Sequence, residues 1–336
     1  MQPNVERLHH VSEPFVDRKL WLRESDGEAT ETLPYYLRHA SVVALSDHQI
    51  IATTWSGRCL LIDIDTGEVL PQPMVASTRE GRLDAGFTLD SPSVKFGDPP
   101  VVGVATRASW AGFWPLGATE ARKLAPQRSD PVTAVALSPH AAVAAIGLGF
   151  YPLSNDRRSA AIELWTLDAE PKLLSSTVLL PDAAVDQLAW DPYRNRLLAL
   201  SGAVNQDRGH AWVFDGDTLF VRHVVETGGC MYRFAGFVDG GCSIVAISHK
   251  TVELHGISRP IKPPRYWTSS GEITGAGICE ATSRIFLSTG DIISLDEDMI
   301  SAFDTIPECV AVAVLPNGGC VALSEAGMLR IWDEIR

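Results

Sequence analysis

Several features that would identify a membrane or secreted protein are missing from this sequence. No apolar run is long enough to span a bilayer as a helix. The first 18 residues, from Met1 to Arg18, lack the apolar core of a secretory signal. Helical periodicity does not persist anywhere in the chain. We therefore expect a soluble cytoplasmic protein built from strands.

The usual signatures of catalysis and metal binding are also missing. The chain has no G-x-S-x-G elbow, no glycine-rich phosphate loop and no H-E-x-x-H motif. Its six cysteines form no C-x-x-C pair and no cluster with histidine that suits zinc. We expect them to be mostly buried free thiols, as in a cytosolic protein. The sequence thus predicts no catalytic residue, no metal and no cofactor.

Positive charge is in deficit over the whole chain. The sequence has 28 Lys and Arg against 41 Asp and Glu, which gives a formal net charge of −13. Such a charge favours solubility and disfavours broad attraction to nucleic acid, although it does not exclude a local basic patch. Hydrophobic residues make up 46% of the chain, as in ordinary globular proteins. The charge therefore makes nucleic acid an improbable partner.

The C-terminal stretch from Val310 to Arg336 is the clearest structural unit. Three apolar segments are separated by the turn residues Pro316 to Gly319 and by Glu325 to Gly327. Alternating segments joined by such turns predict an antiparallel meander. A lone meander of three strands buries too little to be stable, so this unit needs neighbours.

The same unit recurs along the chain. The last apolar residue of the first strand recurs at intervals of between 37 and 53 residues, at Leu45, Phe87, Leu137, Trp190, Phe237, Ile278 and Leu315. A large apolar residue near the end of the third strand follows each of them, at Ile62, Trp114, Trp165, Phe214, Leu254, Leu295 and Trp332. A repeat of this length with several strands per copy predicts propeller blades.

Four segments resemble the WD-repeat family of β-propellers. Pro131–Pro139 and Val185–Pro192 are similar to that family's first strand and turn, Leu61–Glu68 is similar to the end of a blade, and Trp332-Asp333 is a literal Trp-Asp pair. The resemblance covers about residues 40–336. The family's Gly-His pair before the first strand is absent from most units, and its aspartate before the third strand is mostly missing.

We therefore predict one all-β domain over residues 1–336, a seven-bladed β-propeller with four-stranded antiparallel blades. The approximate blade ranges are 37–80, 81–127, 128–179, 180–226, 227–268, 269–304 and 305–336. Residues 1–36 form an N-terminal arm. The seventh unit ends without a fourth strand, and a ring closes best when no sheet edge is left open. We expect the arm to supply the outer strand of the last blade.

The loops between second and third strands emerge on one face of such a disc and carry basic and aromatic side chains. We call this set the basic-aromatic arc; its members are Trp55, Arg58, Arg107, Trp110, Tyr151, Arg157, Arg158, Arg208, His210 and Lys250. Units six and seven place Asp291 and Glu325 there instead. Arginine and aromatic residues anchor protein interfaces. Two alternatives stay open: these residues are ordinary turn residues, or Trp55 and Trp110 pack between blades.

A second candidate surface is the segment from Arg259 to Trp267, rich in proline, basic and aromatic residues. It either binds a partner's groove or crosses the outside of a blade, and we favour the crossing.

The resemblance implies a non-catalytic scaffold, a monomeric propeller that docks an acidic segment of a partner protein within a larger assembly. Two other functions remain as alternatives. One is a propeller hydrolase or lactonase with a metal in the channel, and the other is a nucleic-acid-binding propeller that uses the arc. Function has to be argued from a site, and the sequence alone shows none that would carry catalysis.

Overall fold

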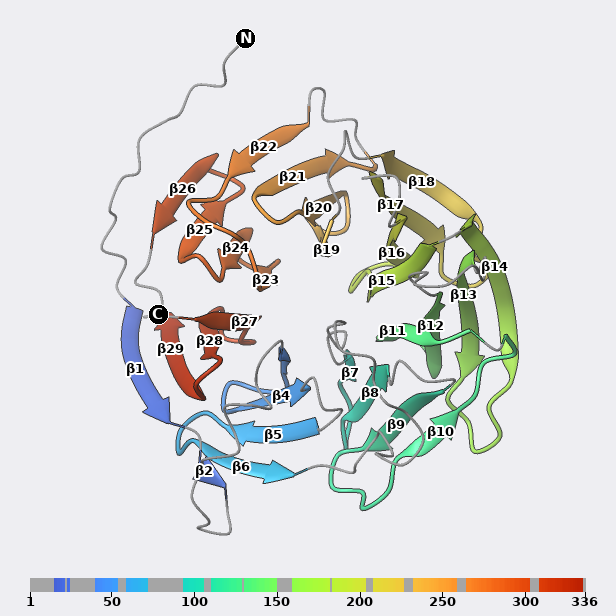
Figure 1. Ribbon diagram of the computed structural model, residues 1–336, viewed down its shortest axis with the longest axis horizontal. Helices are drawn as coiled ribbons and strands as arrows, with labels where there is room; N and C mark the ends of the chain where they lie inside the picture. Colours follow the sequence, from blue (N-terminus) through green and yellow to red (C-terminus); the bar gives the residue numbers. More distant parts are fainter. Residues whose placement is uncertain are drawn as a thin grey trace.

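Seven small sheets arranged around a common centre make up the molecule (Figure 1). The computed structural model describes residues 15–21, 23–24, 40–53, 59–71, 93–105, 110–128, 130–149, 159–181, 183–203, 208–226, 232–258, 264–302 and 308–334. Within these ranges there are strands β1 to β29 and no helix. The prediction of an all-β, seven-bladed propeller with four-stranded antiparallel blades is confirmed.

Each blade is numbered here in chain order, and its first strand lies nearest the centre (Figure 1). Blade one contains β3 (Ser41–Ala44), β4 (Gln49–Thr53), β5 (Cys59–Asp63) and β6 (Glu68–Pro71). Blade two contains β7 (Ser93–Lys95), β8 (Val101–Ala105), β9 (Ala111–Pro115) and β10 (Arg122–Leu124). Blade three contains β11 (Val132–Leu137), β12 (Val143–Leu148), β13 (Ser159–Thr166) and β14 (Leu173–Pro181). Blade four contains β15 (Ala183–Trp190), β16 (Arg196–Ala203), β17 (Arg208–Asp215) and β18 (Val221–Glu226).

The remaining blades follow the same order. Blade five contains β19 (Phe234–Val238), β20 (Ser243–Ile247), β21 (Thr251–Gly256) and β22 (Arg265–Thr268). Blade six contains β23 (Ala276–Cys279), β24 (Arg284–Leu287), β25 (Asp291–Ser294) and β26 (Met299–Ala302). Blade seven contains β27 (Cys309–Val314), β28 (Cys320–Ser324) and β29 (Met328–Glu334), to which β1 (Phe15–Trp21) is added.

The core lies between the blades. The buried apolar side chains form seven clusters in the described part of the chain, and each cluster draws its members from two neighbouring blades, including blades seven and one. Both faces of a middle strand are therefore covered, as in β20 and β28, where every residue is buried. Because no sheet can bury its faces alone, the ring is the unit that folds.

The first and last described strands, β1 and β29, lie side by side in blade seven (Figure 1). Strand β1 pairs antiparallel with β29, from Phe15 opposite Glu334 to Trp21 opposite Met328. A second short strand, β2 (Arg23–Glu24), adds in parallel to β6 and makes blade one five-stranded. The sequence did not predict this fifth strand. That the ring's stability depends on β1 stays a prediction.

One sequence-based strand assignment is wrong. The sequence aligned Phe87 as the last apolar residue of the first strand in the second unit, but the described first strand of blade two is β7, Ser93–Lys95. Phe87, the apolar residue aligned there, lies outside the described residues, and the first strand of blade two comes later in the chain. β7 is only three residues long, Ser-Val-Lys, so it shows no apolar alternation by which to recognise it.

Five of the six cysteines fall in the described part of the chain, and all five are free thiols. Cys59, Cys279 and Cys320 are buried. Burial raises the pKa of the Cys59 thiol to about 12, which keeps it protonated and unreactive at neutral pH. The expectation of buried, unpaired thiols holds for these three. Across the same described part, no helix is long and apolar enough to cross a membrane.

Candidate functional site

Three residues of the basic-aromatic arc are described with their side chains. Trp55, Arg58, Arg107, Tyr151, Arg157 and Arg158 lie outside the described residues. Arg208 begins β17, but its side chain also lies outside them. Trp110, His210 and Lys250 are described, and they belong to blades two, four and five. These three side chains lie at or near the loops that join second strands to third strands.

Trp110 is half-buried beside β9. It packs in the cluster between blades one and two, which includes Leu61 and Trp114. The Lys123 ammonium group from β10 lies over its ring, 4.5 Å from the centroid. This position agrees with the alternative that Trp110 packs between blades, and it leaves part of the ring exposed with a cation beside it.

His210 forms one end of a column of rings along β17. Its ring centroid lies 5.6 Å from that of Trp212, and Trp212 stacks on Phe214 at 6.3 Å. The spacing of two places these side chains on one face of the strand. Trp212 donates from Nε1 to the Ser201 hydroxyl at 3.0 Å, which fixes the middle ring. The half-buried His210 is therefore held on a rigid strand, near the N-terminal end of β17.

Lys250 is displayed by a tight turn between β20 and β21. The Ser248 hydroxyl accepts hydrogen bonds from the backbone N–H groups of Lys250 at 3.3 Å and Thr251 at 3.0 Å. The carbonyl oxygens of His249 and Lys250 accept bonds from Ile273 and Ser269 in the loop that leads into blade six. Both side chains of the His249-Lys250 pair are exposed. The fold thus holds two cation-forming groups outward at a fixed position.

Asp291 is not an exposed acid of this face, contrary to the sequence-based expectation. Its side chain is only 3% exposed. One carboxylate oxygen accepts from the hydroxyls of Ser269 at 2.6 Å, Ser270 at 3.0 Å and Thr289 at 2.9 Å, and from the Ser270 N–H. The carboxylate turns inward because these donors converge on it. Blade six therefore has a hydrogen-bond network around a buried aspartate at the start of its third strand.

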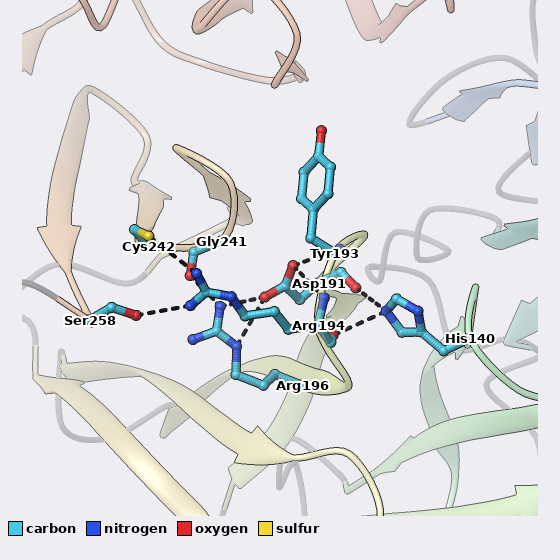
Figure 2. Close-up of polar contacts among 8 residues, drawn as sticks. All are labelled: His140, Asp191, Tyr193, Arg194, Arg196, Gly241, Cys242 and Ser258. Carbon is cyan, nitrogen blue, oxygen red and sulfur yellow. Dashed lines mark hydrogen bonds and ion pairs between the residues drawn. The ribbon is translucent and has the colours of Figure 1, made fainter.

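The opposite face carries a polar cluster that the sequence did not predict (Figure 2). Asp191, which is fully buried, follows β15 and accepts from Arg196 Nε at 2.9 Å and also from Arg196 Nη2. It also accepts from the backbone N–H groups of Tyr193 at 2.9 Å and Arg194 at 3.2 Å. A buried carboxylate needs such partners, and this one has four donors.

This cluster joins three blades (Figure 2). His140 of blade three bonds through Nε2 to the carbonyl oxygen of Asp191 at 2.8 Å. Arg196 donates to the carbonyl oxygen of Gly241 in blade five, and Arg194 donates to the Ser258 hydroxyl at 3.2 Å. Since His140, Arg194 and Arg196 each bond to a neighbouring blade, the cluster is a joint between blades.

Blade six reaches the same joint through Glu280. Burial raises the pKa of this carboxyl group, the nearby Asp191 carboxylate raises it further, and the backbone N–H groups of Gly240 and Gly241 oppose the rise. Elsewhere on this face, Lys95 donates to the Ala141 carbonyl oxygen, and the Asn317 N–H donates to Asp47 Oδ1 at 2.7 Å. Turns between first and second strands thus link several pairs of neighbouring blades.

Tyr193 is displayed at the edge of the joint. Its ring points away from the cluster (Figure 2) and the residue is 62% exposed. Among the described residues, no group of three or more His, Cys, Asp or Glu side chains is placed to hold a metal ion. Tyr193 is therefore an exposed aromatic side chain beside the joint.

The second candidate segment forms part of a blade. Arg265, Tyr266 and Trp267 lie in β22, the outer strand of blade five, while residues 259–263 lie outside the described part. Trp267 is buried and Tyr266 is 60% exposed. The C-terminal half of the segment therefore crosses the outside of a blade, as favoured from the sequence.

Comparison with known proteins bears on the fold. No protein-family model matches the sequence, and no curated protein matches it. The architecture is that of a WD40-type β-propeller. Among solved structures, the chain is similar to the WD40 β-propeller domain of Doa1, with a TM-score of 0.63 over 88% of this chain and 92% of that one. The two share 15% sequence identity, so this likeness establishes the fold alone.

Proposed function

We propose that this protein is a non-catalytic cytoplasmic scaffold that binds one or more partner proteins within a larger assembly. The WD40-type fold supports the proposal, since it is commonly used as a protein-interaction scaffold and is usually non-catalytic. The proposed docking surface is the face with the basic-aromatic arc, and the proposed ligand is an acidic segment of a partner. No cofactor takes part.

The observation that carries the proposal is the display of His249 and Lys250 by the turn between β20 and β21. Both side chains are exposed, while the backbone of their turn is tied down on both sides by Ser248 and by the loop into blade six. A protein with net charge −13 that fixes a lysine ammonium group and a histidine ring outward at one loop can attract a carboxylate-bearing segment there. Preordering the turn also reduces the entropic cost of binding.

The remaining arc would extend this surface across blades one to four. Its arginines bind carboxylates through paired hydrogen bonds, and its aromatic side chains supply rigid contact area. His210, at the end of its ring column, is the described example of an aromatic group on this face.

The test is charge reversal on each face. Partners of the native protein are first identified by pull-down from native lysate with mass spectrometry. The variant with Arg157→Glu, Arg158→Glu and Lys250→Glu is expected to weaken partner binding by at least about 100-fold, roughly 2.7 kcal/mol. Its melting temperature should not change, because Lys250 is exposed in a turn and the sequence predicts a loop at Arg157 and Arg158.

Lys172→Glu is the matched control. Lys172 is exposed in the turn between β13 and β14, which emerges on the opposite face. This variant should bind partners as the native protein does. Binding that survives the three reversals would eliminate the arc face as the docking surface. If binding disappears on nuclease treatment, the partner is a nucleic acid and not a protein.

A further inference from the structure

The outer strand of blade three, β14, differs from the other outer strands. It is nine residues long, from Leu173 to Pro181, and has no ionisable side chain. It lies at the circumference of the disc (Figure 1). In the part of the chain that the structure describes, it pairs with β13 alone, so its other edge has no strand partner.

Most other outer strands are protected as exposed edges usually are. They are shorter, and β1, β10, β18 and β22 each contain charged residues. Strand β26 is uncharged but only four residues long. Charge and short length discourage pairing with another chain, and β14 has neither protection.

Contacts with blade four also fix β14 in a position where a further strand could pair with it. Its inward-facing Ser175 donates from Oγ to the Thr218 carbonyl oxygen of blade four at 3.2 Å, and Leu179 packs into the cluster between blades three and four. On its other face Leu174 is 52% exposed, Val178 is 54% exposed, and Ser176 between them is exposed. A rigid, uncharged edge with apolar side chains on its free face is a template for a further strand.

Blade one shows that an outer strand of this molecule accepts a fifth strand, because β2 adds to β6. We propose that β14 also accepts a fifth strand, and that its occupant is β14 of a second copy of this chain. Antiparallel pairing about a two-fold axis at Ser176 puts Leu174 opposite Val178 of the other copy. The edge is then complementary to itself, as a two-fold interface requires, and brings no like charges together along the strand.

The size of the interface and the charge of each copy set the expected affinity of the dimer. Pairing centred on Ser176 joins residues 173–179 of the two copies. It buries an interface at the small end of the range, below about 1,200 Å², so a dissociation constant of about 1–100 µM is expected. The net charge of −13 on each copy opposes association. Added salt screens that repulsion, so it should tighten the dimer, whereas it would weaken an interface made of ion pairs. This inference does not depend on the proposed function of the arc face.

The experiment is sedimentation velocity of the full chain from about 1 to about 200 µM, at low and high salt. A reversible monomer–dimer equilibrium that salt tightens is expected. Val178→Lys and, separately, Leu174→Lys should weaken the dimer by at least about tenfold with unchanged melting temperature, since both side chains are more than half exposed. A protein that stays monomeric throughout overturns the proposal.

Met299→Lys is the matched control, since it puts the same charge on β26, the other uncharged outer strand. The dimer should survive it, and a dimer lost only in this variant would place the interface on β26 and overturn the assignment. Ser176→Cys tests the pairing itself. Mild oxidation should link two copies of this variant in a disulfide-bonded dimer on a non-reducing gel, but not two copies of the native chain. A dimer that sediments as such yet never cross-links at this position overturns the two-fold pairing at Ser176.

Discussion

At the scale of single residues, buried charge is used to connect blades. Asp191 is fully buried, and its ion pair with Arg196 reaches the backbone of the next blade through Gly241. Asp291 gathers three hydroxyl groups in blade six. A buried carboxylate is costly unless its lone pairs are satisfied, so each of these positions depends on its partners more than an exposed carboxylate does.

Asp191→Asn is expected to lower the free energy of unfolding by about 3 kcal/mol, because the variant leaves Arg196 buried without its counter-charge. Denaturant titration measures the loss. The control Asp217→Asn changes an exposed aspartate and should cost less than about 0.5 kcal/mol. Adding Arg196→Met to Asp191→Asn should recover part of the loss, because no unpaired charge remains. If Asp191→Asn is as stable as the native protein, the ion pair is not what holds this joint.

At the scale of elements, the turn between β19 and β20 is shaped by two glycines with different surroundings. Gly241 has φ +74°, and a Cβ there would lie 2.4 Å from Asp191 Oδ2. Gly240 has φ +57°, and a Cβ there would meet nothing within 4 Å. Both positions therefore carry backbone strain for other residues, but only Gly241 lets the buried carboxylate approach the backbone.

Substituting each glycine by alanine separates these two effects. Gly240→Ala should cost about 1 kcal/mol, the cost of a left-handed conformation for a residue with a Cβ. Gly241→Ala should cost at least about 2 kcal/mol more, since it also displaces Asp191. Chemical denaturation of both variants measures the difference. Equal losses would mean that Asp191 can move away from this turn at little cost.

At the scale of the whole molecule, stability is a property of the closed ring. Every apolar cluster in the described part bridges two neighbouring blades, and the cluster of blades one and seven completes the circle. Strand β1 brings an early segment of the chain to the outer edge of the last blade. We propose that this pairing closes the ring because β1 covers the otherwise open edge of β29.

Deletion of residues 1–24, which removes β1 and β2, is therefore expected to lower the melting temperature by at least about 5 °C. Thermal unfolding followed by circular dichroism measures it. Deletion of residues 1–14 alone is the control, because it leaves both strands in place, and it should have little effect. Unchanged melting after the longer deletion would show that the ring is stable without this strand.

The repeat pattern was visible in the sequence because blade strands alternate between apolar and other residues at a regular spacing. The predicted third-strand residues Ile62, Trp114, Trp165 and Phe214 all lie in third strands. The short strand β7 escaped this kind of prediction because three residues cannot show an alternation. The fifth strand β2, at two residues, escaped it for the same reason.

The sequence by itself determined the fold class and the number of blades, because local alternation and turn residues are recorded in the order of the chain. Only the tertiary structure decided which polar residues meet. Asp291 and Asp191 look alike in the sequence as acids near turns, yet both are buried and both meet distant residues. Asp291 accepts from Ser269 and Ser270 in the loop that follows blade five, and the backbone carbonyl of Asp191 meets His140 of blade three. Contacts between blades join residues about fifty positions apart, and no local pattern specifies which side chains face each other across that distance.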